Sequence, residues 1–158
     1  MNNIDSIIAT DVVLKLLRGT QFDTIRVFSL IVQLGFVRTG LVQDLPQEVW
    51  IVLSGNLQVG NQTAPDFKPT PGDFFSRRAN ALSDCYHLIG KEVSDARVAD
   101  SGTLEITLSK AKICVEADEE GDLEEIWGVM SETPNPMTEH QWYVSLDDSC
   151  RLSAHVPN

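Results

Sequence analysis

The chain has 158 residues, of which 42% are hydrophobic, enough for one domain with a buried core. No apolar run approaches the roughly 18 residues of a membrane span, and no basic region precedes an apolar one at the N-terminus, so we expect neither a membrane segment nor a secretory signal. The net charge of −11 argues against nucleic acids and anionic membranes as partners, because both require clustered lysine and arginine.

The first predicted element is a helix. Residues 12–17 are almost entirely apolar, which indicates a well-buried helix with a cap at Thr10 or Asp11 and an end at Gly19. The β-branched pair Val12 and Val13 leaves a strand open as an alternative.

Three β-rich segments follow, over residues 23–28, 30–36 and 49–53. The second alternates, which places one set of apolar side chains on a single sheet face: Leu30, Val32, Leu34 and Phe36. The third is apolar throughout and is therefore expected to be a central strand buried on both faces. After a turn signal at Gly55, the strand resumes at residues 57–59.

Residues 60–73 contain three prolines and two glycines and predict a loop. A helix is expected next, capped by Ser76 and ended by Gly90, with Ala79, Leu82, Tyr86 and Ile89 recurring at helical spacing. Six strands are predicted after it, over residues 92–99, 103–108, 112–116, 124–130, 142–146 and 151–155.

These elements predict an α+β fold, with two helices packed on antiparallel β-sheets in a single domain over residues 1–158. Residues 17–27 and 88–98 are similar: in each, an apolar helix end meets a glycine and then a strand carrying Arg-Val. Either a duplicated helix-plus-meander unit or a chance match explains this. A duplication would give halves 1–60 and 74–158, joined by the loop at 60–73.

The net negative charge comes entirely from the second half of the chain. Residues 1–80 hold seven acids and seven basic residues, whereas residues 81–158 hold sixteen acids and five basic residues. A one-sided field attracts basic partners and accelerates their encounter. The densest acidic stretch, residues 116–125, has seven acids and no base: Glu116, Asp118, Glu119, Glu120, Asp122, Glu124 and Glu125.

Three interpretations of this acidic segment compete: a solvated loop, a docking surface for a basic protein, and a calcium site. The spacing Glu116-x-Asp118-x-Glu120-Gly121 matches the start of a calcium-binding loop. However, the twelfth position, which needs a bidentate acid, is Trp127. Nearby acidic loops favour docking, and Trp127 and Trp142 are expected to fill the core.

Other site chemistries have little support in the sequence. The three cysteines form no Cys-x-x-Cys pair and are expected to be reduced thiols, which indicates a cytoplasmic protein. The histidines lack metal-ligand spacing, and neither a nucleophile elbow nor a phosphate-binding loop occurs. The doublet Arg77-Arg78 is expected to bridge to acids elsewhere. We therefore expect no enzyme, no metal and no cofactor.

The region from residue 88 to 129 resembles a small bacterial domain of unknown function. The matching segments are residues 88–93, 102–108, 113–115 and 123–127, which give a Gly-x-x-Val strand, a Gly-Thr-Leu strand, an acidic loop and a Glu-x-x-Trp strand. This chain departs from the pattern at Ala111, where the family has a turn glycine. Such domains occur among immunity proteins of contact-dependent inhibition and other polymorphic toxin systems.

The resemblance and the charge together lead to a functional expectation: an immunity protein that binds and neutralises a basic toxin, such as a nuclease. The seven acids of the acidic segment are the expected partner-binding residues. Two alternatives stay open: a non-enzymatic homodimeric scaffold or assembly module, and a small-molecule or calcium-binding domain.

Overall fold

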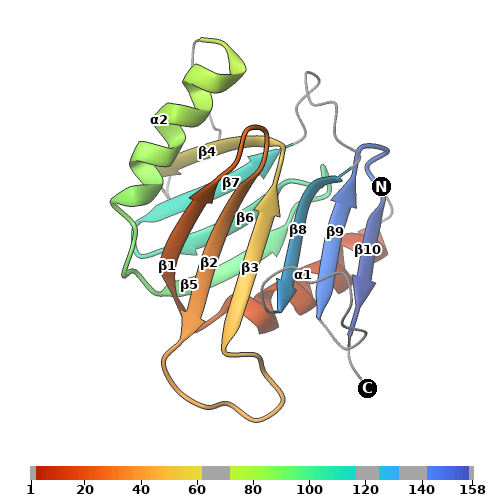
Figure 1. Ribbon diagram of the computed structural model, residues 1–158. Helices are drawn as coiled ribbons and strands as arrows, with labels where there is room; N and C mark the ends of the chain where they lie inside the picture. Colours follow the sequence, from red (N-terminus) through yellow and green to blue (C-terminus); the bar gives the residue numbers. More distant parts are fainter. Residues whose placement is uncertain (1–2, 62–71, 117–124, 132–141, 157–158) are drawn as a thin grey trace.

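The computed structural model describes residues 3–61, 72–116, 125–131 and 142–156. Helices α1 (Asn3–Leu17) and α2 (Phe74–Tyr86) pack with two antiparallel sheets, which confirms the predicted α+β class (Figure 1). Sheet A has the order β1-β2-β3-β8-β9-β10, and sheet B has the order β4-β7-β6-β5. The strands are Thr20–Val27 (β1), Val32–Arg38 (β2), Glu48–Leu53 (β3), Asn56–Asn61 (β4), Val93–Val98 (β5), Leu104–Leu108 (β6), Ala111–Glu116 (β7), Glu125–Ser131 (β8), Tyr143–Asp147 (β9) and Leu152–His155 (β10).

A single apolar cluster joins both sheets and α1. It includes the inward side chains of the predicted alternating strands, such as Leu34 and Phe36 of β2 and Ile106 of β6, all almost fully buried. Each such side chain stabilises the fold by about 1.5–3 kcal/mol through removal from water. The predicted inward position of Leu30 is wrong, because β2 begins at Val32 and Leu30 lies exposed in the preceding turn.

Helix α1 begins well before the predicted cap. Thr10 lies inside the helix, where its hydroxyl donates to Val98 O (3.2 Å) and accepts from Val98 N (2.9 Å) on β5. Its hydroxyl therefore bonds another element instead of the helix's own first turn. The C-terminal end falls two residues before Gly19, close to the predicted end, and Arg38 of β2 donates to Leu16 O (2.7 Å) there.

Helix α2 is capped by Asp73 and not by Ser76. The Asp73 carboxylate accepts from Ser76 N (2.9 Å), and this hydrogen bond lowers the pKa of Asp73. The buried residues of α2 are Arg78, Ala81 and Cys85. The predicted apolar face is only partly right. Leu82 is half-buried against the core, but Ala79 is exposed, Tyr86 is 69% exposed, and Ile89 lies beyond the end of the helix.

Strands β4 and β8 each cross from one sheet to the other. Strands β1, β2 and β3 form an antiparallel meander, after which β4 crosses to sheet B and pairs with β7. Strands β5, β6 and β7 form the second meander, after which β8 crosses to sheet A and pairs with β3. Each four-stranded unit therefore combines three strands from one part of the chain with one from the other (Figure 1).

The two similar sequence segments make matched contacts with each other. Gly19 N donates to Val93 O (3.0 Å), and Gly90 N donates to Phe22 O (2.7 Å). Both pairs of corresponding residues, Gly19 with Gly90 and Phe22 with Val93, are 71 residues apart in the sequence. An isolated bridge joins Gln21 to its own counterpart, Glu92.

The register irregularities also match. Strand β1 has one between Phe22 and Thr24, and β5 has one at the corresponding positions, between Val93 and Asp95. An approximate two-fold relation between the segments produces this reciprocity. It favours two similar meanders, β1–β3 and β5–β7. The helices are placed differently, since α1 packs on β5 and α2 on β4, so the helix-plus-meander duplication and the division into halves at residues 60–73 stay predictions.

Candidate functional site

The acidic segment leaves sheet B and returns to sheet A. Glu116 is the last residue of β7 and Glu125 is the first residue of β8. Both are partly buried. The other five predicted partner-binding residues lie outside the described residues: Asp118, Glu119, Glu120, Asp122 and Glu124.

Both crossings between the sheets meet at one corner. Ser54 N and Gly55 N, between β3 and β4, donate to Ile126 O at 2.9 and 3.1 Å, and the Ser54 hydroxyl donates to Glu125 O. A Cβ atom on Gly55 would lie 2.3 Å from Glu116 O, so only glycine permits this approach. The corner therefore holds both ends of the acidic segment against the β3–β4 crossing.

Arg78 of α2 ties the corner together from a buried position. Its guanidinium donates to Ser54 O (2.7 Å), Gly55 O (3.0 Å) and Leu30 O (2.6 Å) and stacks on Phe74 at 4.2 Å. Charge-assisted hydrogen bonds of this kind are stronger than neutral ones. In these contacts Arg78 therefore donates to backbone carbonyl oxygens. From the sequence, the doublet Arg77-Arg78 was expected to pair with acidic side chains.

The two described carboxylates of the acidic segment accept hydrogen bonds from neutral groups. Glu116 accepts from Gln58 Nε2 (2.9 Å), and Glu125 accepts from the Tyr143 hydroxyl. Burial, together with this hydrogen bond, raises the pKa of Tyr143 to about 12. Within the described residues, neither carboxylate forms an ion pair.

Exposed apolar residues lie on the elements that Arg78 joins. Four of them, at the end of β1, in the β1–β2 turn and at the start of α2, have 42–58% of their surface exposed, and we call this set the corner patch: Val27, Phe28, Leu30 and Phe75. Exposed apolar groups that cluster beside polar ones are typical of interaction surfaces. Sequence analysis missed this patch, because it assigned Leu30 to the core and left Phe28 at a strand end.

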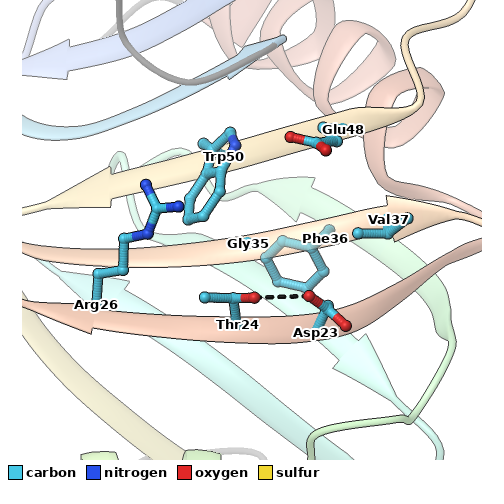
Figure 2. Close-up of a pocket in the computed structure, with 8 residues that line it drawn as sticks. All are labelled: Asp23, Thr24, Arg26, Gly35, Phe36, Val37, Glu48 and Trp50. Atoms are coloured by element: carbon cyan, nitrogen blue, oxygen red, sulfur yellow. Dashed lines mark hydrogen bonds between the residues drawn. The ribbon is translucent and has the colours of Figure 1, made fainter.

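A second feature, a small pocket, lies on the outer face of sheet A. It has a volume of about 150 Å³, and Figure 2 shows its walls on β1, β2 and β3. The lining residues are Asp23, Thr24, Arg26, Gly35, Phe36, Val37, Glu48 and Trp50.

Arg26 and Trp50 form one wall of the pocket. The Arg26 guanidinium stacks on the Trp50 ring at 4.2 Å from its centroid. The indole lies over Gly35, where a Cβ atom would be 2.9 Å from the ring. Although Trp50 is only 5% exposed, its Nε1–H has no hydrogen-bond partner among the described residues. Buried donors are normally paired, so an unpaired one requires an explanation.

The opposite end of the pocket is acidic. Asp23 accepts a hydrogen bond from the Thr24 hydroxyl (2.6 Å), and Glu48 lies across β2 from it (Figure 2). Sequence analysis did not find this pocket, because its residues come from three strands and follow no motif. The closest signals were a tryptophan in a strand predicted to be central and a glycine in an alternating strand.

The described residues offer little to a metal ion or a membrane. In residues 3–61, 72–116, 125–131 and 142–156, no group of three histidine, cysteine or acidic residues has the geometry of a metal site. Within the same ranges, neither helix is long and apolar enough to cross a membrane. The tryptophans fill the core as predicted: Trp127 is fully buried and donates to Gly102 O (2.9 Å), and Trp142 is buried.

No family model, curated protein or solved structure matches the chain.

Proposed function

We propose that this protein is a cytoplasmic, non-enzymatic immunity protein that binds and neutralises a basic toxin, such as a nuclease. The proposed contact surface combines the acidic segment, residues 116–125, with the adjoining corner patch. The three unpaired cysteines suit a reducing compartment.

One observation carries the proposal: the two ends of the acidic segment, Glu116 and Glu125, lie at the same corner as exposed apolar side chains. Arg78 bonds both the Leu30 carbonyl of the patch and the Ser54 carbonyl, while the Ser54 hydroxyl bonds Glu125 O. Protein interfaces combine an apolar and aromatic centre with a polar rim. Phe28 and Phe75 would supply the aromatic centre of the interface, and the acids would supply its polar rim.

The acids would act mainly on association. A cluster of carboxylates steers a basic protein towards the corner and aligns it, which raises the association rate at low ionic strength. The bound acids would then cover the basic cleft of the toxin in place of its polyanionic substrate. Affinity would come largely from the apolar contact, because exposed ion pairs contribute little.

The polypeptide encoded next to this protein's gene is the partner to test. We expect its C-terminal domain to bind this protein, with an association rate that falls about tenfold or more when salt rises from about 50 to about 300 mM. Stopped-flow mixing measures the rate, and cell growth during co-expression measures neutralisation.

Two variants of equal charge separate the acidic segment from net charge. The first converts the seven acids of the segment to amides and should lose most of the steered rate. The second variant should keep the steered association rate. It makes the same change at seven exposed acids outside the segment: Asp5, Asp11, Asp44, Asp84, Glu92, Asp95 and Asp148. Equal losses in both variants would refute the assigned surface.

The scaffold alternative makes a different prediction. A homodimer held by apolar contacts would persist at high salt and at every protein concentration above its dissociation constant. Sedimentation of the isolated protein distinguishes it from the proposal. A salt-insensitive dimer without binding to the neighbouring polypeptide would replace the immunity function with the scaffold function.

A further inference from the structure

Helix α1 covers the edge of β5, the outermost strand of sheet B. The Thr10 hydroxyl accepts from Val98 N (2.9 Å) and donates to Val98 O (3.2 Å), so the outward peptide groups of this edge residue are paired. Ala96 and Val98 are paired with buried residues of β6 and are themselves only 2% and 5% exposed. An edge covered in this way is closed to other chains.

The corresponding edge of β1 is not covered. With the spacing of 71 residues, Ile25 corresponds to Ala96 and Val27 to Val98. Ile25 and Val27 are likewise paired with buried residues, those of β2. However, Val27 is 58% exposed and Ile25 is only partly buried. The same inward positions are therefore closed on β5 and open on β1.

The backbone at the two strand ends also corresponds. Phe28 N donates to Ile31 O (2.8 Å) across the β1–β2 turn, as Ala99 N donates to Thr103 O (2.9 Å) across the β5–β6 turn. Peptide groups alternate in direction along a strand. Val27 N and O therefore point away from β2, in the direction in which Val98 N and O meet Thr10.

The sequence explains why α2 does not cover β1. The two helices begin 71 residues apart, at Asn3 and Phe74. The core-facing side of α1 includes four apolar residues: Ala9, Val12, Val13 and Leu16. The corresponding positions of α2 are polar and exposed: Asn80, Ser83, Asp84 and His87. Ala81, at the position of Thr10, has no hydroxyl. Helix α2 packs on β4 instead, and the place over the β1 edge lacks its helix (Figure 1).

The free part of this edge suits a helix better than a strand. Gly90 N donates to Phe22 O and Phe22 N donates to Lys91 O, so the first half of β1 is already paired. Only residues 24–27 remain, which is fewer than the roughly 5–6 residues of a typical strand. A helix needs no ladder of hydrogen bonds, since on β5 one hydroxyl serves the edge.

Charge complementarity orients such a helix. In α1, the Ser6 hydroxyl near the N-terminus donates to Asp100 in the β5–β6 turn (2.9 Å). A helix docked in the same direction on β1 has its N-terminus at the β1–β2 turn, which Arg78 joins to the corner that holds Glu116 and Glu125. Negative charge is favourable near a helix N-terminus, and a basic residue in the first turn adds to this attraction.

We propose that a helix of the toxin docks on the free edge of β1, in the place that α1 has on β5. The helix has an aliphatic face towards Ile25 and Val27, a serine or threonine that bonds Val27 N and O, and a basic first turn. Amphipathic helices that lie in apolar grooves are a common mode of recognition. The inference rests on the proposed function in assigning the helix to the toxin, whereas the site can be tested without it.

A peptide with the sequence of residues 3–18 is the probe for the intact protein. A lactam bridge between Asp11 and Lys15, which are exposed and one helical turn apart, holds the peptide helical. In NMR titrations it should shift the amide signals of Val27 and Phe28 saturably, with a dissociation constant on the order of 0.1 mM, and leave Val98 in place. Shifts at Val98 alone, or no saturable shift at Val27, would overturn the proposal.

Two further peptides test the form and the direction of the occupant. The same sequence without the lactam bridge should bind about tenfold more weakly, because the helix must then form on binding. Tighter binding without the bridge would indicate an added strand and reject the helix. The bridged peptide with Asp5→Lys should bind about threefold more tightly at low salt. An unchanged or weaker affinity would reject the orientation towards the acidic corner.

A pair of protein variants locates the site. Val27→Asp should abolish binding of the bridged peptide, because it places a charge against the aliphatic face of the helix. Leu41→Asp makes a similar change at a residue of the β2–β3 loop that is 89% exposed, and it should leave binding intact. Both variants should keep the urea midpoint of the wild type. Equal effects of the two variants on peptide binding would refute the assignment to β1.

The polypeptide encoded next to this protein's gene separates the site from the proposed function. Val27→Asp should weaken its C-terminal domain at least tenfold, and Leu41→Asp should not. Peptide binding at Val27 without binding of that domain would remove the immunity function and the assignment of the helix to the toxin. Binding of the domain that Val27→Asp leaves unchanged would retain the immunity function and overturn the helix site.

Discussion

The meanders β1–β3 and β5–β7 have the same inner face and different outer faces. Inward positions of the second strand match one for one: Val32 with Leu104, Leu34 with Ile106, and Phe36 with Leu108, all buried. Outward positions hold an ion-pair network on sheet B and an open pocket on sheet A. The shared core fixes the inner positions, whereas the outer positions are free to acquire separate roles.

Inner positions should respond equally to truncation. Leu34→Ala and Ile106→Ala each remove a fully buried side chain, and each should lower the free energy of unfolding by about 2–5 kcal/mol. Urea unfolding followed by circular dichroism measures both. If one substitution cost less than about 1 kcal/mol, the two inner faces would not be energetically equivalent, and the comparison would hold for the backbone alone.

The crossings between the sheets should be the next most sensitive feature. Gly55→Ala brings a Cβ atom to 2.3 Å from Glu116 O and 2.7 Å from the Ile126 side chain, and should destabilise by about 1–3 kcal/mol or more. Gly40→Ala is the matched control, because a Cβ atom there meets nothing within 4 Å. It should be neutral or stabilising by up to about 1 kcal/mol.

A tolerated Gly55→Ala would show that the corner relaxes easily. In that case the ends of the acidic segment would not be held against the β3–β4 crossing. The acidic segment and the corner patch would then lack the fixed relation on which the proposed interface depends.

The ion pairs on the outer face of sheet B should make the stability depend on pH, with a smaller effect than the substitutions above. Glu105→Gln should cost about 1 kcal/mol at neutral pH, since Arg97 is largely exposed and the pairs are screened. Because the pKa of Glu105 is lower in the folded state, its contribution is fully present above the unfolded pKa, near 4.5, and is lost as pH falls through the lowered value.

Urea midpoints between about pH 3 and pH 7 test this. The difference between the wild type and Glu105→Gln should shrink as pH decreases below the unfolded pKa. A difference that is constant over this range would mean that Glu105 stabilises sheet B through packing and not through its charge.

The strands were largely predictable because their signal is local. Alternation in residues 103–108 and apolar continuity in residues 49–53 gave β6 and β3 within one residue at each end. Two of the errors in the helices arose from tertiary contacts. The Thr10 hydroxyl bonds β5 and does not cap a helix, and α2 buries Arg78 and Ala81 while Tyr86 stays exposed. The third error was local, because Asp73 caps α2 in place of Ser76.

The sites were less predictable because they depend on cross-strand pairing. Arg26 and Trp50 are 24 residues apart, and only the registers β1–β2 and β2–β3 bring them together over Gly35. The exchange of β4 and β8 between sheets likewise has no local signature beyond the Gly55 turn. The acidic segment was evident from composition, but five of its seven acids lie outside the described residues.

The smallest expected effect on stability comes from converting sheet A towards sheet B. Gln33→Glu places a carboxylate opposite Arg26, at the position that Glu105 occupies opposite Arg97. An exposed cross-strand ion pair should stabilise by about 0.2–1 kcal/mol and draw the Arg26 guanidinium off the Trp50 ring. The nearby acids Asp23 and Glu48 will reduce this gain, because they repel the new charge.

Urea midpoints at low and high salt measure this gain, and the indole N–H shift of Trp50 reports whether the cation has left the ring. A stabilisation that high salt abolishes, together with a shifted Trp50 signal, means that a single substitution gives the outer face of sheet A an ion pair like that of sheet B. If the Trp50 signal stays in place, the stacking of Arg26 on the indole outweighs a direct carboxylate partner, and sheet A has diverged through Trp50 and Gly35 more than through Gln33.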